Sequence, residues 1–233
     1  MIEAPPLERT WFATPKGNYV AVWYRSDTTD WNTANACISA DEYGLGDASW
    51  SGIALDVGAH IGAASLALLA DNPELTVIAI EGLPDNAEVL RRNLAQFGNR
   101  AHIFQAAAAC GAPHDVTLAY GATGTEFEQH HRFIGGEIID GQGPTGERVT
   151  VGSVSLGQIV ADWGPISLMK LDCEGCEWTF LDDPAITEVA EIRGEYHPTN
   201  GHGPADLRRL LEPTHEVTLD DDVTFGPFRA VRR

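Results

Sequence analysis

The sequence predicts an α/β fold: a mostly parallel, doubly wound sheet with an antiparallel final strand and an N-terminal β-rich extension. The chain has 233 residues, of which 43% are hydrophobic and 21% charged, and this is typical of one globular domain. From residue 53 onward, short apolar segments alternate with helical ones, and this alternation requires parallel strands joined by right-handed crossovers. A short acidic turn joins the last two strand segments, which predicts an antiparallel pair.

The first 50 residues are predicted to form a β-hairpin and cap extension. Residues 11–13 and 19–24 are rich in aromatic and branched side chains and flank a Pro-Lys-Gly-Asn turn, a pattern typical of a hairpin. The following stretch, residues 25–40, is polar and is expected to help shape a pocket for a small molecule.

Residues 51–233 are predicted to form the main domain. Strands are expected at residues 53–57, 76–80, 102–105, 166–171, 188–196, 215–219 and 223–231. Helices are expected at residues 61–71, 84–97, 154–163 and 205–211, and from about residue 176. Residues 111–148 are rich in Gly, Thr and Glu and interrupt the alternation. We expect them to form a long loop with a short strand pairing, a lid-like insertion over the active site that carries His130 and His131.

The charge of the chain argues against polyanionic partners. Lys and Arg number 15 against 34 Asp and Glu, a formal net charge of −19 that repels nucleic acid and anionic membranes. The most apolar segment, residues 61–70, is too short to cross a bilayer, and the first residues lack the features of a secretory signal. A cytoplasmic location is therefore expected. In a reducing compartment Cys173 and Cys176 are expected to be small apolar filler, since no second such pair is present to complete a metal site.

The turn after the first strand of the main domain indicates a nucleoside-binding site. It reads Asp56-Val-Gly58-Ala-His60-Ile-Gly62. Gly58 permits a sharp turn and Gly62 a close approach of the helix to the ligand. The G-x-G-x-x-G spacing of a dinucleotide site is absent, and the Asp56 carboxylate would repel a pyrophosphate. A ligand with a sulfonium and an ammonium suits this turn better, so the turn predicts S-adenosylmethionine, with His60 as a further candidate contact.

The end of the second strand supports the same ligand. Glu81 follows Asp56 by 25 residues, and its carboxylate is placed to accept both hydroxyls of a ribose. Leu83 is expected to pack on one face of the adenine. Two alternatives stay open from these residues: a catalytically silent module that binds the cofactor, and a nucleotide-dependent oxidoreductase, which the missing phosphate glycines disfavour.

Three sequence blocks carry a specific resemblance. They are residues 54–62 (Ala-Leu-Asp-Val-Gly-Ala-His-Ile-Gly), 77–86 (Val-Ile-Ala-Ile-Glu-Gly-Leu-Pro-Asp-Asn) and 168–177 (Leu-Met-Lys-Leu-Asp-Cys-Glu-Gly-Cys-Glu). In order and spacing they resemble the FkbM-type methyltransferases, and the match extends from Tyr43 to His197. The resemblance implies a Rossmann-like class I methyltransferase fold and S-adenosylmethionine-dependent O-methylation of a hydroxyl on a sugar or natural product. It also implies Tyr43 as a cofactor contact.

The sequence departs from that family pattern near the adenine. Glu81 is followed by Gly rather than the frequent Pro, and the third strand runs into Gln105-Ala106 without the Asp that often caps adenine. Adenine recognition is therefore assigned to Gln105 and to the backbone at Ala106.

The block Lys170-Leu-Asp172-Cys-Glu174-Gly-Cys-Glu177 ends a strand beside the expected methyl group. Asp172 is the first candidate base and a candidate partner of the methionine ammonium. His197 ends the neighbouring strand and is the second candidate base, because a neutral imidazole accepts a proton near pH 7. Glu174 and Glu177 are expected to stabilise the start of a helix. Asp172, His197 and Glu195 are oxygen-rich enough for Mg²⁺, but nothing requires a metal and none is expected. A homodimer is left open.

Overall fold

The structure, a computed structural model, describes residues 6–120, 136–138 and 147–233. Its main sheet has the strand order β12-β13-β11-β10-β3-β4-β5. The bounds are β3 Gly52–Val57, β4 Leu75–Ile80, β5 Ala101–Phe104, β10 Ile166–Leu171, β11 Glu191–Tyr196, β12 His215–Leu219 and β13 Gly226–Arg232. β13 runs antiparallel to β11 and β12, and the other pairs are parallel. The predicted α/β fold with an antiparallel final strand is confirmed.

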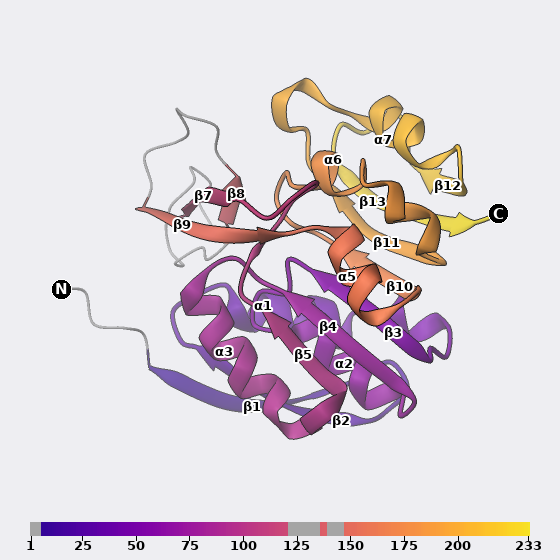
Figure 1. The fold of residues 1–233 in the computed structure, drawn as a ribbon. Helices are drawn as coiled ribbons and strands as arrows, with labels where there is room; N and C mark the ends of the chain where they lie inside the picture. Colours follow the sequence, from indigo (N-terminus) through magenta and orange to yellow (C-terminus); the bar gives the residue numbers. More distant parts are fainter. Residues whose placement is uncertain (1–5, 121–135, 139–146) are drawn as a thin grey trace.

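Alternation along the strands divides the core into two layers, one on each face of the sheet. Ala54, Val77 and Ala79 pack on one face with α2 (Ala63–Asp71) and α3 (Pro84–Leu94). The neighbouring residues Leu55 and Ile78 face the other side, where α5 (Leu156–Trp163) and α7 (Pro204–Leu211) pack. Figure 1 shows these two helical layers with the sheet between them. Because both faces are covered, a central strand such as β4 (Leu-Thr-Val-Ile-Ala-Ile) is almost entirely apolar rather than alternating with polar residues.

The N-terminal extension packs on the α2–α3 layer. β1 (Leu7–Ala13) and β2 (Tyr19–Arg25) form the predicted hairpin as a separate two-stranded sheet. The polar stretch that follows is not a loop: it contains α1 (Asp30–Ala34), which continues as a wider helical turn, Asn35–Ser39. Asp30 is fully buried here because Arg25 bonds both of its carboxylate oxygens, at 2.8 Å (Nε to Oδ2) and 2.9 Å (Nη2 to Oδ1). Composition alone did not reveal this buried ion pair.

A second sheet stands where the lid-like insertion was expected. It has the order β6-β9-β7-β8, with β6 Ala107–Ala108, β7 Asp115–Tyr120, β8 Gly136–Ile138 and β9 Glu147–Val154. The expected insertion, residues 111–148, is therefore partly regular strand, and β9 begins before the helix predicted from residue 154. His130 and His131 lie outside the described residues, so their expected role at a lid is not addressed.

The remaining elements are short. α6 (Glu177–Phe180) follows β10, and single helical turns occupy Leu45–Asp47, Ala95–Arg100, Pro184–Glu188 and Thr199–Gly201. Among the helices that the structure describes, none combines the length and apolar character needed to cross a membrane.

Candidate active site

A cavity opens at the carboxyl ends of β3, β4 and β10. The strand order reverses between β3 and β10, and ligands of open α/β sheets bind at such a point. The cavity encloses about 930 Å³ of empty space, part of it open to solvent. The N-terminal extension closes one wall through Thr29, Thr33, Cys37 and Tyr43. The extension is thus part of the site.

Two glycines shape the turn after β3, in different ways. Gly58 has a φ of 73° and lines the cavity, and a Cβ there would collide with the backbone carbonyl of Asp172. The second glycine of the turn, Gly62, has a φ of 88°, and a Cβ there would lie 2.6 Å from a methyl group of Leu90. Gly62 therefore allows α2 to pack against α3. The expectation that it lets the helix approach the ligand is wrong for this structure, because Gly62 is not part of the cavity wall.

Asp56 does not line the cavity, contrary to the expectation from the sequence. It is fully buried, and its Oδ2 accepts hydrogen bonds from the Ser65 amide (3.1 Å) and hydroxyl (2.6 Å). Its Oδ1 lies 3.4 Å from Nζ of Lys170, which also donates to the carbonyl of Gly58 at 2.9 Å. Burial lowers the pKa of Lys170, but Asp56 and Asp172 outweigh it and raise that pKa above its ordinary value. Asp56 thus acts inside the fold, holding the ends of β3 and β10 together.

Glu81 and Leu83 line the cavity. The Glu81 carboxylate accepts from the amides of His60 and Leu83, both at 2.8 Å, and from Nδ2 of Asn86 at 3.4 Å. Burial raises the pKa of Glu81 to about 7, although the two backbone hydrogen bonds act in the opposite direction. The carboxylate is therefore fixed at the cavity wall before any ligand arrives.

Of the two expected adenine contacts after β5, Ala106 lies at the cavity and Gln105 does not. Ala106 lines the cavity, and its amide donates to the carbonyl of Glu81 at 3.1 Å. Gln105 is exposed, lies away from the cavity wall, and accepts a hydrogen bond from Arg91 at 2.6 Å. The expected role of Gln105 in adenine recognition is not supported by this position. Its side chain points away because neighbouring residues of an extended segment alternate in direction.

His60 lines the cavity with a positive φ of 52°. Its Nε2 lies 3.5 Å from Oδ1 of Asp30, while its Nδ1 is buried with no hydrogen-bond partner among the described residues. Burial lowers the pKa of His60 to about 4, against the charge of Asp30 and with the help of Arg25 and Lys170. The imidazole is neutral at pH 7, so Nδ1 is an available hydrogen-bond acceptor when Nε2 carries the proton toward Asp30.

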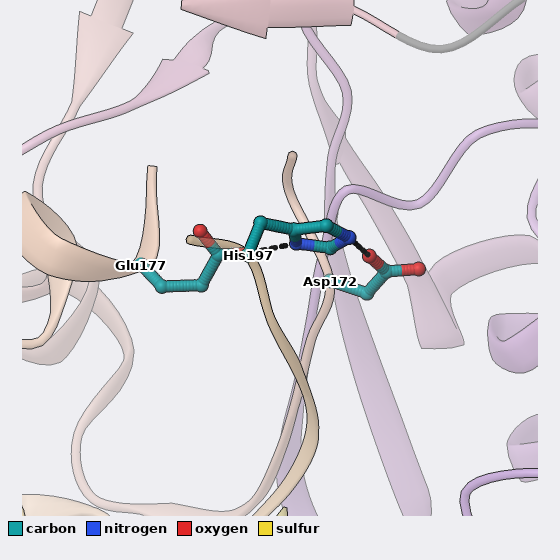
Figure 2. A group of neighbouring side chains, drawn as sticks. All are labelled: Asp172, Glu177 and His197. Carbon is teal, nitrogen blue, oxygen red and sulfur yellow. Dashed lines mark hydrogen bonds and ion pairs between the residues drawn. The ribbon is translucent and has the colours of Figure 1, made fainter. Parts of the chain in front are cut away.

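His197 lies between two carboxylates, as Figure 2 shows. Its Nδ1 donates to Oε1 of Glu177 at 2.7 Å, and its Nε2 lies 3.9 Å from Oδ1 of Asp172 and 3.4 Å from Oε2 of Glu174. Burial lowers the pKa of His197, but the hydrogen bond to Glu177 and the charges of Glu174, Glu177 and Asp172 outweigh it and raise the pKa to about 9. These carboxylates therefore favour the protonated imidazole at pH 7, whereas the prediction from the sequence assumed a neutral one.

Glu177, which the sequence analysis assigned to helix stabilisation, is a partner of His197 in the structure. It is fully buried in the first turn of α6, and its Oε1 holds His197. A glutamate at a short helix start is ordinary in a sequence, and only the return of β11 alongside β10 shows what it faces. The signal that was available is the spacing of Asp172, Glu174 and Glu177 within one block.

Tyr43 and Asp172 meet across the cavity. The Tyr43 hydroxyl donates to Oδ2 of Asp172 at 2.8 Å, and the tyrosine ring lies 5.2 Å from Nζ of Lys170. Burial and the neighbouring Asp172 raise the pKa of Tyr43, so it stays a donor. The other oxygen of Asp172, Oδ1, is buried and has no hydrogen-bond partner in the described part of the chain.

Cys173 and Cys176 form a disulfide rather than apolar filler. Both line the cavity, on the turn between Asp172 and Glu177. The expectation failed because it inferred the state of the thiols from the compartment, whereas the turn brings the two Cα atoms to 5.5 Å, within bonding range. Cys37 and Cys110 are free.

The seven-stranded sheet with its reversed final strand, and the cavity at the switch point, define a class I methyltransferase. Comparison with known proteins gives the family: residues 56–217 match the family described as "Methyltransferase FkbM domain". The chain belongs to this FkbM family and is an S-adenosylmethionine-dependent methyltransferase.

One solved structure agrees on the fold. The chain is similar to precorrin-6y C5,15-methyltransferase from Geobacter metallireducens GS-15, with 10% identity, a TM-score of 0.50, and coverage of 90% of this chain and 92% of that one. At this identity the likeness bears on the fold alone. Weaker similarities are found to the C-terminal domain of precorrin-6Y C5,15-methyltransferase from Rhodobacter capsulatus (11% identity, 90% and 93% coverage, TM-score 0.46) and to TrmK from M. capricolum in complex with S-adenosyl-homocysteine (10% identity, 82% and 68% coverage, TM-score 0.42). No curated protein matches the sequence significantly.

Proposed function

We propose that this methyltransferase acts on a hydroxyl oxygen of a small molecule, a sugar or a natural-product moiety, with Asp172 as the general base. One observation carries the proposal: Asp172 lies at the cavity wall with one oxygen held by Tyr43 and the other buried without a hydrogen-bond partner among the described residues. A carboxylate oriented in this way is suited to accept a hydroxyl proton.

The residues of the cavity fit S-adenosylmethionine. Gly58 lines the cavity and lets the turn after β3 pass close to the backbone of Asp172, Glu81 presents a fixed carboxylate, and Leu83 and Ala106 provide apolar surface. We propose these four residues and His60 as the cofactor contacts. When bound, S-adenosylmethionine supplies an activated methyl group and leaves as S-adenosylhomocysteine once the acceptor oxygen has taken it.

The protein's part in the reaction is positioning and proton transfer. Holding the acceptor oxygen in line can supply about 7–11 kcal/mol of the barrier, whereas a general base contributes about 10²–10⁴-fold. Tyr43 orients Asp172 for this transfer through its 2.8 Å hydrogen bond. His197 is unsuited to be the first proton acceptor, because a group with a pKa of about 9 already carries its proton at pH 7. Its charge instead faces Asp172 and Glu174.

The test is methyl transfer to a panel of hydroxylated metabolites, with the product identified by mass and by the NMR signal of an O-methyl group. Asp172→Asn is expected to lower kcat by roughly 10²-fold or more and to change the affinity for S-adenosylhomocysteine less than about threefold. The control Asp162→Asn makes the same charge change at an exposed position on α5 and should leave kcat unchanged.

Two results would contradict the proposal. Methyl transfer only to nitrogen or carbon acceptors would refute the assignment of a hydroxyl as the acceptor. An unchanged kcat in Asp172→Asn would refute Asp172 as the general base. Cofactor binding without turnover on any acceptor would favour the catalytically silent module.

A further inference from the structure

One group of side chains in this site has more ligand atoms than the proposed proton transfer uses. Asp172, Glu177 and His197 each offer one ligand atom, and these atoms all lie within 4.8 Å of one another. Figure 2 shows the two carboxylates on either side of the imidazole. Ligand atoms around one metal ion at about 2.0–2.3 Å are separated by at most about 4.0–4.6 Å, so side-chain shifts of less than about 1 Å would let the group hold a single ion.

Unpartnered oxygens within the group point independently to a ligand. Glu177 has no exposed side-chain surface, and its Oε2 lacks a hydrogen-bond partner among the described residues. Oδ1 of Asp172 is also a buried atom without a hydrogen-bond partner among these residues, although the Asp172 side chain as a whole is 25% exposed. Burying a carboxylate oxygen without a partner costs about 1–3 kcal/mol or more, and a bound cation removes that cost.

The charges around the group lead to the same conclusion. Asp172, Glu174 and Glu177 surround the single imidazole, with 3.9, 3.4 and 2.7 Å from their nearest oxygens to its nitrogens. Lys170, the nearest lysine, is already paired with Asp56. Three carboxylates facing one imidazole leave negative charge that a divalent cation can balance.

We propose that Asp172, Glu177 and His197 bind a divalent first-row transition-metal ion. Two carboxylates and one imidazole match the preferences of ions such as Mn²⁺ or Zn²⁺, and the imidazole makes Ca²⁺ less suitable. His197 would release its extra proton to solvent when it binds the ion. Three protein ligands leave further coordination positions on the ion. Of the three, Asp172 lines the cavity, so on the proposed function above an acceptor hydroxyl would meet the ion beside Asp172 and become more acidic there.

The test uses Mn²⁺ alone on the full chain after treatment with EDTA, without cofactor or acceptor. Electron paramagnetic resonance should count one bound Mn²⁺ per chain, and calorimetry should give its Kd. At 100 times Kd the Tm should rise by about 5 °C or more. Glu177→Gln and His197→Gln should each weaken binding at least tenfold. The control Glu188→Gln removes one negative charge at an exposed position and should bind as the wild type does.

The comparison of variants guards against loss of folding. If Glu177→Gln lowers the Tm without metal, His197→Gln and the metal-induced change in Tm of each variant still report on the site. Absence of saturable Mn²⁺ binding, or equal binding by wild type and both site variants, would overturn the proposal.

Failure of the metal site and failure of the proposed function are distinguishable. O-methylation at full kcat by EDTA-treated enzyme that binds no Mn²⁺ would refute the metal site and leave the function standing. One tightly bound Mn²⁺ lost in the site variants, on an enzyme that methylates only nitrogen or carbon, would support the metal site and refute the function.

Discussion

Replacing Lys170 by Met should destabilise the protein by about 3–5 kcal/mol, since it leaves a buried charge without its partner. Lys170 is 3% exposed and Asp56 is 0% exposed, and their charged atoms are 3.4 Å apart. In the variant the Asp56 carboxylate would keep only Ser65 as a partner. The carbonyl of Gly58 would also lose its 2.9 Å hydrogen bond from the ammonium group.

The assay is the free energy of unfolding at pH 7 from urea denaturation, with the slope m monitored for constancy. A second variant isolates the cause: adding Asp56→Asn to Lys170→Met removes the stranded charge while an amide oxygen can still accept from Ser65. The double variant should therefore be more stable than Lys170→Met by at least about 1 kcal/mol. Arg91→Met is the matched control. Its partners are Glu88, which is 3.8 Å away and 80% exposed, and the exposed Gln105, so the loss should stay below about 1 kcal/mol.

Two results would refute this reasoning. A loss below about 1 kcal/mol in Lys170→Met would mean that water or a rearranged partner solvates Asp56. A double variant less stable than Lys170→Met would mean that the carboxylate contributes through contacts other than the ion pair.

Three further predictions follow from the same geometry. Gly58→Ala should lower the free energy of unfolding by roughly 2 kcal/mol or more and weaken binding of S-adenosylhomocysteine in calorimetry, because the added Cβ meets the carbonyl of Asp172. The control Gly52→Ala, at a φ of 78° with no atom within 4 Å of the added Cβ, should cost about 1 kcal/mol. Equal losses of stability in the two variants would contradict the collision. The pKa of His197 is raised from 6.5 to about 9, so its stabilising contribution is complete below pH 6.5 and is lost as the pH rises through 9. The difference in free energy of unfolding between wild type and His197→Gln should therefore shrink across that range. A difference independent of pH would be inconsistent with a protonated imidazole. Reducing the disulfide between Cys173 and Cys176 with a dithiol should lower the Tm by about 4–8 °C, corresponding to about 2 kcal/mol for so short a loop. A Cys173→Ser/Cys176→Ser variant should show the lower Tm with or without the dithiol. A dithiol effect on the Tm that persists in this variant would show that another group is responsible.

The order of the strands and helices was predictable because it depends on local patterns. Apolar runs of five or six residues, each followed by a helical segment, require a parallel sheet whatever the side chains at the site are. The hairpin at the N-terminus and the antiparallel final pair were likewise encoded in turns of a few residues. The helix Asp30–Ala34 was missed because its buried aspartate is balanced by Arg25, and an ion pair of this kind leaves no periodic signal in the sequence.

By itself, the sequence determined the methyltransferase fold, the strand ends that surround the cavity, and Asp172 as a residue at its wall. The tertiary structure alone decided where each polar side chain points: Asp56 into the core against Lys170, Gln105 outward to Arg91, and Glu177 inward to His197. It also set the raised pKa of His197, because that depends on three carboxylates from the segment after β10 meeting a ring at the end of β11. The physical reason is the range of the forces. Strand and helix formation depend on near neighbours in the chain, whereas burial and charge depend on which residues the completed sheet brings together.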